Sequence, residues 1–139
     1  MWISMDTLRP LGELLVAWLS ELLAIDPRAT VAIICRAAPE AARLEQNLRR
    51  GLPTRLALDG EFDFLPGISV TCVADVKGLE FDYVVVPDAS AARYPDTPEA
   101  RRALYVAVTR AIHQVWLSSV GSWSPILPAQ ALQSASEGV

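Results

Sequence analysis

The sequence contains 139 residues, of which 52% are hydrophobic and 20% are charged. This length and composition exclude a disordered chain and fit one folded domain with a buried core. The formal net charge is −4, and an acidic domain is a poor stand-alone nucleic-acid binder because binding to phosphates normally requires clustered Lys and Arg. Any contact with DNA would therefore use a local patch beside another domain.

The first part of the chain predicts a helix followed by a buried strand. Asp6 or Thr7 is expected to cap this helix, and Asp26-Pro27 is expected to end it. The apolar face of the helix repeats at helical spacing through Leu11, Leu14, Leu15, Trp18, Leu19 and Leu22. The elements expected next are a strand over Thr30–Cys35, a helix over Pro39–Arg50 and a short strand over Thr54–Leu58.

The second part of the chain predicts further buried strands. Two of them are expected at Ile68–Ala74 and Tyr83–Val86, and a last one at Gln114–Ser118. From Gly121 onwards the composition predicts a short helix and a frayed end.

A long helix is expected between these strands. Alternating apolar residues from Leu104 to Val108 are compatible with a strand. The initial proline and the good helix formers after it instead favour a helix over Pro98–Ile112. The far end of this helix would carry Thr109 and Arg110.

Strands that alternate with helices predict a three-layer α/β domain, in which a parallel sheet lies between two layers of helices. We expect an N-terminal helix and lead-in over residues 1–29, the α/β domain over 30–120 and a tail over 121–139. Cys35 and Cys72 lie in apolar segments without metal-ligand spacing, so we expect reduced core residues of a cytoplasmic protein and no metal site. No apolar run is long enough to predict a membrane span or a signal peptide.

Three positions carry residues that could bind phosphate. Arg110 has a planar and permanently charged guanidinium, and it is either a phosphate ligand or a surface charge that interacts with the helix dipole. Arg36 directly follows a strand, where it either points to solvent or reaches a ligand. Gly78 permits either a close approach of the backbone to a ligand or a turn with positive φ.

These positions belong to segments that resemble motifs of a known family. Lys77–Phe81 reads K-G-L-E-F, and Tyr105–Ala111 reads Y-V-A-V-T-R-A. Their order and spacing resemble motifs five and six of the superfamily-one DNA helicases of the UvrD/Rep/PcrA kind. The strand that ends at Arg36 resembles motif four, together with Leu44, Glu45 and Leu48 in the helix that follows.

The resemblance implies the second RecA-like motor domain of an ATP-dependent DNA helicase. In that family the motif-six arginine, here Arg110, acts as an arginine finger on the γ-phosphate held by the first motor domain. The motif-four arginine, here Arg36, would reach the phosphates of the nucleotide, and Glu80 would contact its ribose beside Gly78. The resemblance also implies contacts with single-stranded DNA, or coupling between DNA and nucleotide.

Lys77, Tyr105 and Thr109 are the candidates for these DNA or coupling contacts. For Lys77 a structural and a functional role are both open. For Tyr105 and Thr109, the alternatives are core packing and hydrogen bonding at the helix end.

Two features depart from the complete pattern of the family. The sequence has no G-x-x-x-x-G-K-[ST], which would form the Walker A phosphate loop. ATP with Mg²⁺ would therefore be held by an N-terminal Walker A domain of the same protein, and this chain alone should not hydrolyse ATP. Ala74 stands where the pattern often has a His that helps to contact single-stranded DNA. The short segment Gly60–Gly67 resembles the compact, helicase-four-like branch.

Two other functions remain open. A catalytically inert RecA-like module could serve in protein interaction or regulation, which the acidic charge and Ala74 favour. An unrelated doubly wound nucleotide-binding domain is the other, although no glycine-rich loop follows any expected strand.

Overall fold

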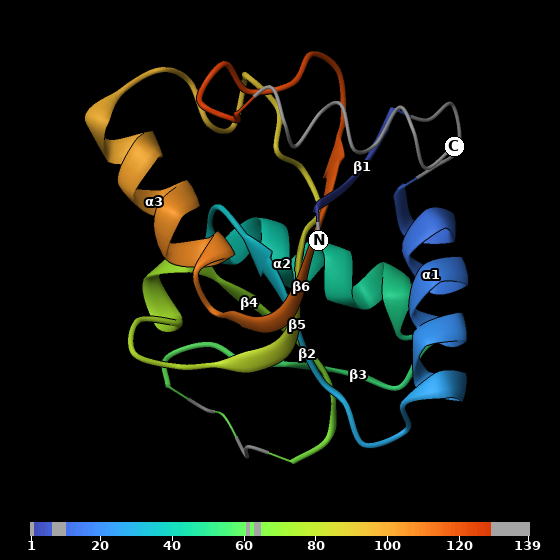
Figure 1. The fold of residues 1–139 in the computed structure, drawn as a ribbon. Helices are drawn as coiled ribbons and strands as arrows, with labels where there is room; N and C mark the ends of the chain where they lie inside the picture. The colour runs from blue at the N-terminus through green and yellow to red at the C-terminus, as the bar shows by residue number, and fades with distance from the viewer. Residues whose placement is uncertain (1, 7–10, 61, 63–64, 129–139) are drawn as a thin grey trace.

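The computed structural model describes residues 11–60, 62 and 65–128, together with the backbone of residues 2–6. The elements in chain order are β1 (Trp2–Asp6), α1 (Leu11–Ile25), β2 (Thr30–Cys35), α2 (Ala38–Leu48), β3 (Thr54–Leu56), β4 (Gly67–Cys72), the 3-10 turn η1 (Val73–Asp75), β5 (Phe81–Val86), α3 (Pro98–Val108) and β6 (Ala111–Ser119) (Figure 1).

Within the described residues, six strands form one sheet in the order β1-β6-β5-β2-β4-β3. Every neighbouring pair is parallel. Figure 1 shows α1 and α3 on opposite sides of this sheet. The expected three-layer α/β fold is therefore confirmed.

Each face of the sheet has its own apolar core, because the central strands are apolar on both faces. One core joins the buried faces of α1 and α2 to side chains such as Ile33 and Val70. The other core joins α3 and η1 to side chains such as Ile34 and Val84. Alternate residues of β2 thus serve opposite cores, as the period of two in a strand requires.

The two cysteines are buried free thiols in neighbouring strands, as expected. Cys35 at the end of β2 is in register with Cys72 at the end of β4. Burial is the main cause that raises the pKa of both thiols, that of Cys35 to about 12. Both sulfurs are therefore protonated near neutral pH and serve as packing groups.

The first element of the fold is a strand that the sequence analysis missed. Trp2–Asp6 forms β1 and pairs with β6, so Asp6 is the last residue of a strand and not a helix cap. Thr7, the other expected cap, lies outside the described residues. Pairing across more than a hundred residues has no local signal, which is why this strand was not predicted. The division of the chain into residues 1–29, 30–120 and 121–139 stays a prediction.

The helix expected over Pro98–Ile112 ends earlier than predicted. Thr97 caps α3 by accepting a hydrogen bond from the amide of Ala100, but the helix stops at Val108. The strand β6 begins at Ala111, three residues before its expected start, because Ala111 pairs with the first residue of β5. Sheet hydrogen bonds there outweigh the helix propensity of the sequence. Arg110 therefore lies in the connection between α3 and β6 and not in the last turn of the helix.

The end of the described chain also differs from the prediction. No helix forms between residues 121 and 128, and residues 129–139 lie outside the described part. Trp123 instead forms an antiparallel bridge with Ser90. The hydroxyl of Ser124 donates a hydrogen bond of 2.5 Å to the carbonyl of Tyr94. These contacts bind the segment to the loop that precedes α3.

Glu45 ties α2 to β3. Its side chain is 3% exposed, and both its oxygens accept hydrogen bonds from Arg49, one of them at 2.9 Å from Nε. The hydroxyl of Thr54 donates to the same carboxylate at 3.1 Å. The hydrogen bonds from Arg49, and then the one from Thr54, hold the pKa of Glu45 below its ordinary value, although burial opposes them. Glu45 therefore has a structural role beside β3.

We expect stability to depend on the ionisation of Glu45. Because its pKa is lowered in the folded state, the carboxylate stabilises the fold above its ordinary pKa of about 4.5 and loses this effect as the pH falls through the folded-state value. Urea unfolding between pH 6 and pH 3 should show a smaller loss of unfolding free energy for Glu45→Gln than for the wild type. Glu21→Gln, at an exposed position on α1, should follow the wild type. An equal loss for Glu45→Gln would contradict the assignment.

Candidate functional site

Arg110 occupies the turn between α3 and β6, and its backbone is fixed from both sides. Its amide donates to the carbonyl of Ala107 at 3.3 Å, and its carbonyl accepts from the amide of Phe81 at 2.9 Å. Only some of the N–H groups of the guanidinium make hydrogen bonds among the described residues. One terminal nitrogen donates to Thr109 Oγ1 at 3.2 Å, and Nε is buried without a partner there. The side chain is half-buried, and the N–H groups of its terminal nitrogens that Thr109 does not use are the ones that could bind an anionic ligand.

The K-G-L-E-F segment approaches the same turn from the neighbouring strand. The amide of Leu79 closes a turn onto the carbonyl of Val76 at 3.0 Å, and Gly78 lies in that turn with φ of +79°. A Cβ at Gly78 would meet no atom within 4 Å, so the positive φ explains this glycine better than a close approach within the chain. The turn leaves Lys77 and Glu80 exposed.

Glu80 and Arg110 are therefore neighbours at the end of the sheet where the strands begin, which we call the amino edge. Glu80 precedes the first residue of β5, Arg110 precedes the first residue of β6, and these first residues are paired. The edge is reinforced by Asp82, whose amide donates to Thr30 Oγ1 at 2.9 Å and whose carboxylate accepts from the Thr30 amide at 3.0 Å. This reciprocal pair joins the amino ends of β2 and β5. The residues that carry a carboxylate and a guanidinium thus directly precede two paired residues of β5 and β6.

Arg36 lies at the other edge of the sheet. It follows β2 directly, at the carboxyl ends of the strands. A six-residue strand rises by about 20 Å, and no hydrogen bond or ion pair in the described part of the chain joins Arg36 to Glu80 or Arg110. The structure thus brings together two of the three residues expected at one nucleotide site and leaves Arg36 apart.

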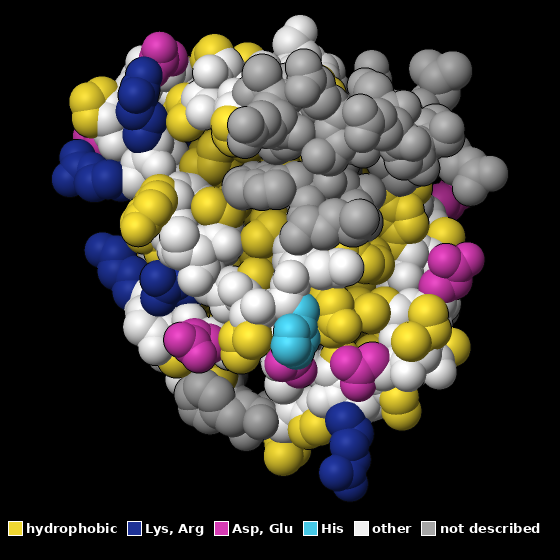
Figure 2. Space-filling view, in the orientation of Figure 1, with side chains coloured by type: hydrophobic (Ala, Val, Ile, Leu, Met, Phe, Trp, Pro, Cys, Tyr) yellow, Lys and Arg dark blue, Asp and Glu magenta, His cyan; other side chains and the backbone are white. Residues whose placement is uncertain are grey.

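The three candidates for DNA or coupling contacts differ in their surroundings. Thr109 Oγ1 donates to the carbonyls of Tyr105 and Val106, at 2.7 and 3.2 Å, so its hydroxyl serves the end of α3. Tyr105 is 68% exposed on the outer side of this helix and is not a core residue. Lys77 is exposed in the turn before Gly78. Figure 2 shows Lys and Arg side chains gathered on the side of the molecule that carries α3.

Sequence reasoning missed the side chains that surround Arg36. Tyr94 is fully buried, with its ring centroid 5.6 Å from the guanidinium carbon of Arg36. Arg93 beside it forms ion pairs with Glu40 and Asp88. Asp88, Arg93 and Tyr94 lie in or next to a stretch of small and polar residues that the sequence predicts as a loop, and no local pattern marks them.

The described residues contain no group of three or more His, Cys, Asp and Glu side chains placed to hold a metal ion. None of the described helices combines the length and the apolar character needed to cross a membrane.

A parallel sheet between two layers of helices, as seen here, is the fold of RecA-like helicase C-terminal domains. Residues 68–118 match the model of the UvrD-like helicase C-terminal domain. The crystal structure of the C-terminal domain of a possible DNA helicase from Lactobacillus plantarum WCFS1 is 30% identical, with a TM-score of 0.75, and the alignment covers 89% of this chain and 75% of that one. The chain belongs to the UvrD-like helicase C-terminal domain family.

Two more distant structures share the fold alone. The C-terminal domain of the DEAD-box protein Dbp5 is 13% identical with a TM-score of 0.56, covering 99% of this chain and 83% of that one. The Pyrococcus furiosus Hef helicase domain is 15% identical with a TM-score of 0.55, covering 82% of this chain and 27% of that one. No functionally curated protein sequence matches the chain.

Proposed function

We propose that this domain is the second motor domain of an ATP-dependent DNA helicase and that it completes a nucleotide site held mainly by a first, Walker A domain. The observation that carries the proposal is the adjacency of Glu80 and Arg110 at the amino edge of the sheet, with an Arg110 guanidinium whose one side-chain hydrogen bond in the described part of the chain goes to Thr109. ATP with Mg²⁺, bound by the first domain, is the substrate of this site.

Each residue of the edge has a distinct role in the proposal. Arg110 stabilises the negative charge that develops on the γ-phosphoryl group, because a guanidinium is planar, always charged and able to donate several hydrogen bonds. Glu80 accepts hydrogen bonds from the ribose hydroxyls. Gly78 allows the turn that presents Glu80, and Lys77 and Tyr105 flank the site where they can reach DNA or the first domain.

Arg36 is assigned to a different phosphate. Ligands of one phosphate group must all lie within hydrogen-bond distance of it, whereas Arg36 lies at the opposite edge from Arg110, about 20 Å away along the strands. We therefore propose that Arg36 contacts a backbone phosphate of single-stranded DNA, and that the two edges of the sheet serve the two ligands of the motor.

The proposal is tested by reconstitution of ATP hydrolysis. This chain alone is expected to show no hydrolysis above buffer, because its sequence has no Walker A loop. The complete helicase, with its Walker A domain, is expected to hydrolyse ATP faster when single-stranded DNA is added. A complete protein that binds ATP without hydrolysing it would overturn the proposal and favour the inert interaction module.

A further inference from the structure

Arg36 rests against an aromatic ring, the one partner that its side chain has among the described residues. Its guanidinium carbon lies 5.6 Å from the centroid of the Tyr94 ring, within the range of a cation–π contact. In the described part of the chain, Arg36 makes no hydrogen bond and no ion pair. Its five N–H donors are therefore available, while the ring restrains the direction in which they point.

Tyr94 is itself held rigidly. Its side chain is fully buried in the core beneath α3. Its amide donates to the carbonyl of Ser90 at 2.9 Å, and its carbonyl accepts from the hydroxyl of Ser124. The phenol oxygen is buried without a hydrogen-bond partner among the described residues, so its ring, and not its hydroxyl, accounts for its contacts.

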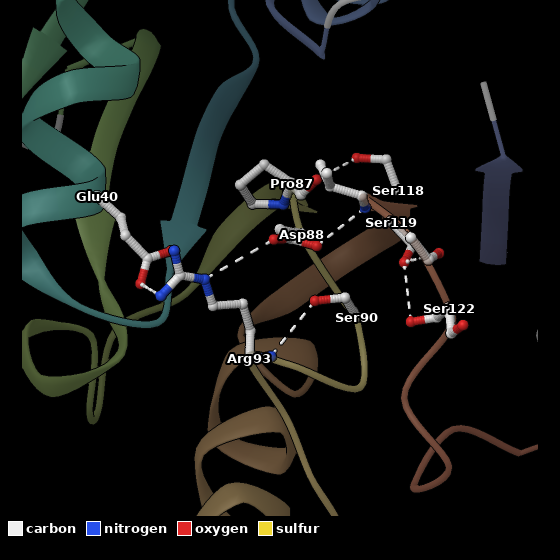
Figure 3. A network of polar contacts seen from close by, with 10 residues as sticks. Glu40, Pro87, Asp88, Ser90, Arg93, Ser118, Ser119 and Ser122 are labelled. Carbon is white, nitrogen blue, oxygen red and sulfur yellow. Dashed lines mark hydrogen bonds and ion pairs between the residues drawn. The ribbon is translucent and has the colours of Figure 1, made fainter. Parts of the chain in front are cut away.

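Arg93, the residue before Tyr94, ties the loop that precedes α3 to two other elements (Figure 3). Arg93 pairs with Glu40 at the start of α2, at 3.1 Å, and with Asp88 at 3.8 Å. Asp88 in turn accepts a hydrogen bond of 3.0 Å from the amide of Val120, just after β6. The amide of Arg93 donates to Ser90 Oγ at 3.3 Å. The backbone next to Tyr94 is thus fastened to both α2 and the end of β6.

We propose that Tyr94 is a positioning residue whose ring holds the Arg36 guanidinium in place to bind a phosphodiester group of single-stranded DNA. This inference rests on the proposed function of Arg36. A long arginine side chain loses rotamer freedom when it binds, and a rigid aromatic support removes part of that cost before the ligand arrives. Tyr94 contacts no DNA in this arrangement and acts through Arg36.

The test uses the 139-residue chain labelled with ¹⁵N-arginine. The Arg36 Nε–Hε NMR signal, assigned with Arg36→Gln, is followed during titration with an oligothymidylate at low salt and, separately, with ADP. Tyr94→Phe keeps the ring, and Tyr94→Leu removes it. If the leucine variant fails to fold, Tyr94→Met replaces it, because methionine fills irregular core space.

We expect the wild type and Tyr94→Phe to bind the oligothymidylate within about twofold of each other, and Tyr94→Leu to bind about three- to tenfold more weakly. The salt dependence should separate positioning from general destabilisation. Arg36→Gln should reduce the slope of log K against log salt by about 0.7, and Tyr94→Leu should shift the slope in the same direction. In the Arg36→Gln background, Tyr94→Leu should have no further effect on binding.

Two results would overturn the inference while leaving Arg36 as a DNA ligand. One is a Tyr94→Leu variant that binds like the wild type, and the other is an equal loss of affinity with and without Arg36. If instead Arg36→Gln leaves DNA binding unchanged, the proposed function of Arg36 fails. A response of Arg36 to ADP but not to the oligothymidylate would overturn the assignment to DNA in favour of the nucleotide.

Discussion

Replacement of Arg110 by alanine is expected to lower DNA-stimulated ATP hydrolysis by the complete helicase about a thousandfold or more, which is the scale of an arginine finger. The guanidinium would be lost from a turn whose backbone is fixed to Ala107 and Phe81, so the change should not move Glu80. The effect should appear mainly in kcat, because the charge on the γ-phosphoryl group develops in the transition state. Steady-state hydrolysis with saturating single-stranded DNA measures it.

Two controls separate the loss of a catalytic group from a loss of folding. Arg43→Ala removes an exposed arginine from α2, which packs on the other face of the sheet from α3, and should hydrolyse ATP at the wild-type rate. The midpoint of thermal unfolding of Arg110→Ala should be close to that of the wild type, because the Arg110 side chain hydrogen-bonds only to Thr109 in the described part of the chain. Near-wild-type hydrolysis by Arg110→Ala would show that Arg110 takes no part in ATP hydrolysis.

Leu117→Ala should lower the free energy of unfolding by about 2–5 kcal/mol. Leu117 is fully buried in β6 and packs in the core that α3 and η1 cover. Its truncation removes apolar contacts and leaves a cavity, because the strands on both sides hold the backbone of β6 in place. Urea unfolding of the 139-residue chain measures the change.

Ile112→Ala is the matched control in the same strand. Ile112 is 57% exposed, so its truncation removes little buried apolar area and should change the unfolding free energy by about 0.5 kcal/mol or less. Equal losses for the two variants would show that the packing assigned to the α3 side of the sheet is wrong.

Most of the fold could be predicted because its signals are local. The apolar runs around Ile33 and Val84 predict buried strands wherever those strands pair. Pro98 and the helix formers after it predict the start of α3, and the structure adds Thr97 as its cap. Gly78 shows the positive φ that was one of its two predicted roles. In each case the physical cause lies within a few residues of the position concerned.

The parts that could not be predicted depend on distant partners. Trp2–Asp6 becomes a strand only because β6 offers it an edge. The helix that carries Tyr105 stops before Arg110 because β5 draws Ala111 into the sheet. Local propensity carries no information about either partner, so both predictions failed at the point where sheet pairing competes with helix formation.

The candidate site likewise has one part that the sequence predicts and another that depends on distant partners. The sequence by itself determined which residues can contact a nucleotide or a phosphate, since the chemistry of Arg36, Glu80 and Arg110 belongs to the side chains. Only the tertiary structure decided which of them lie near one another. The pairing of β5 with β6 places Glu80 beside Arg110, while the direction of β2 carries Arg36 to the opposite edge, beside Tyr94. Parallel pairing aligns the ends of strands that are far apart in the chain, and that alignment cannot be read from any one segment.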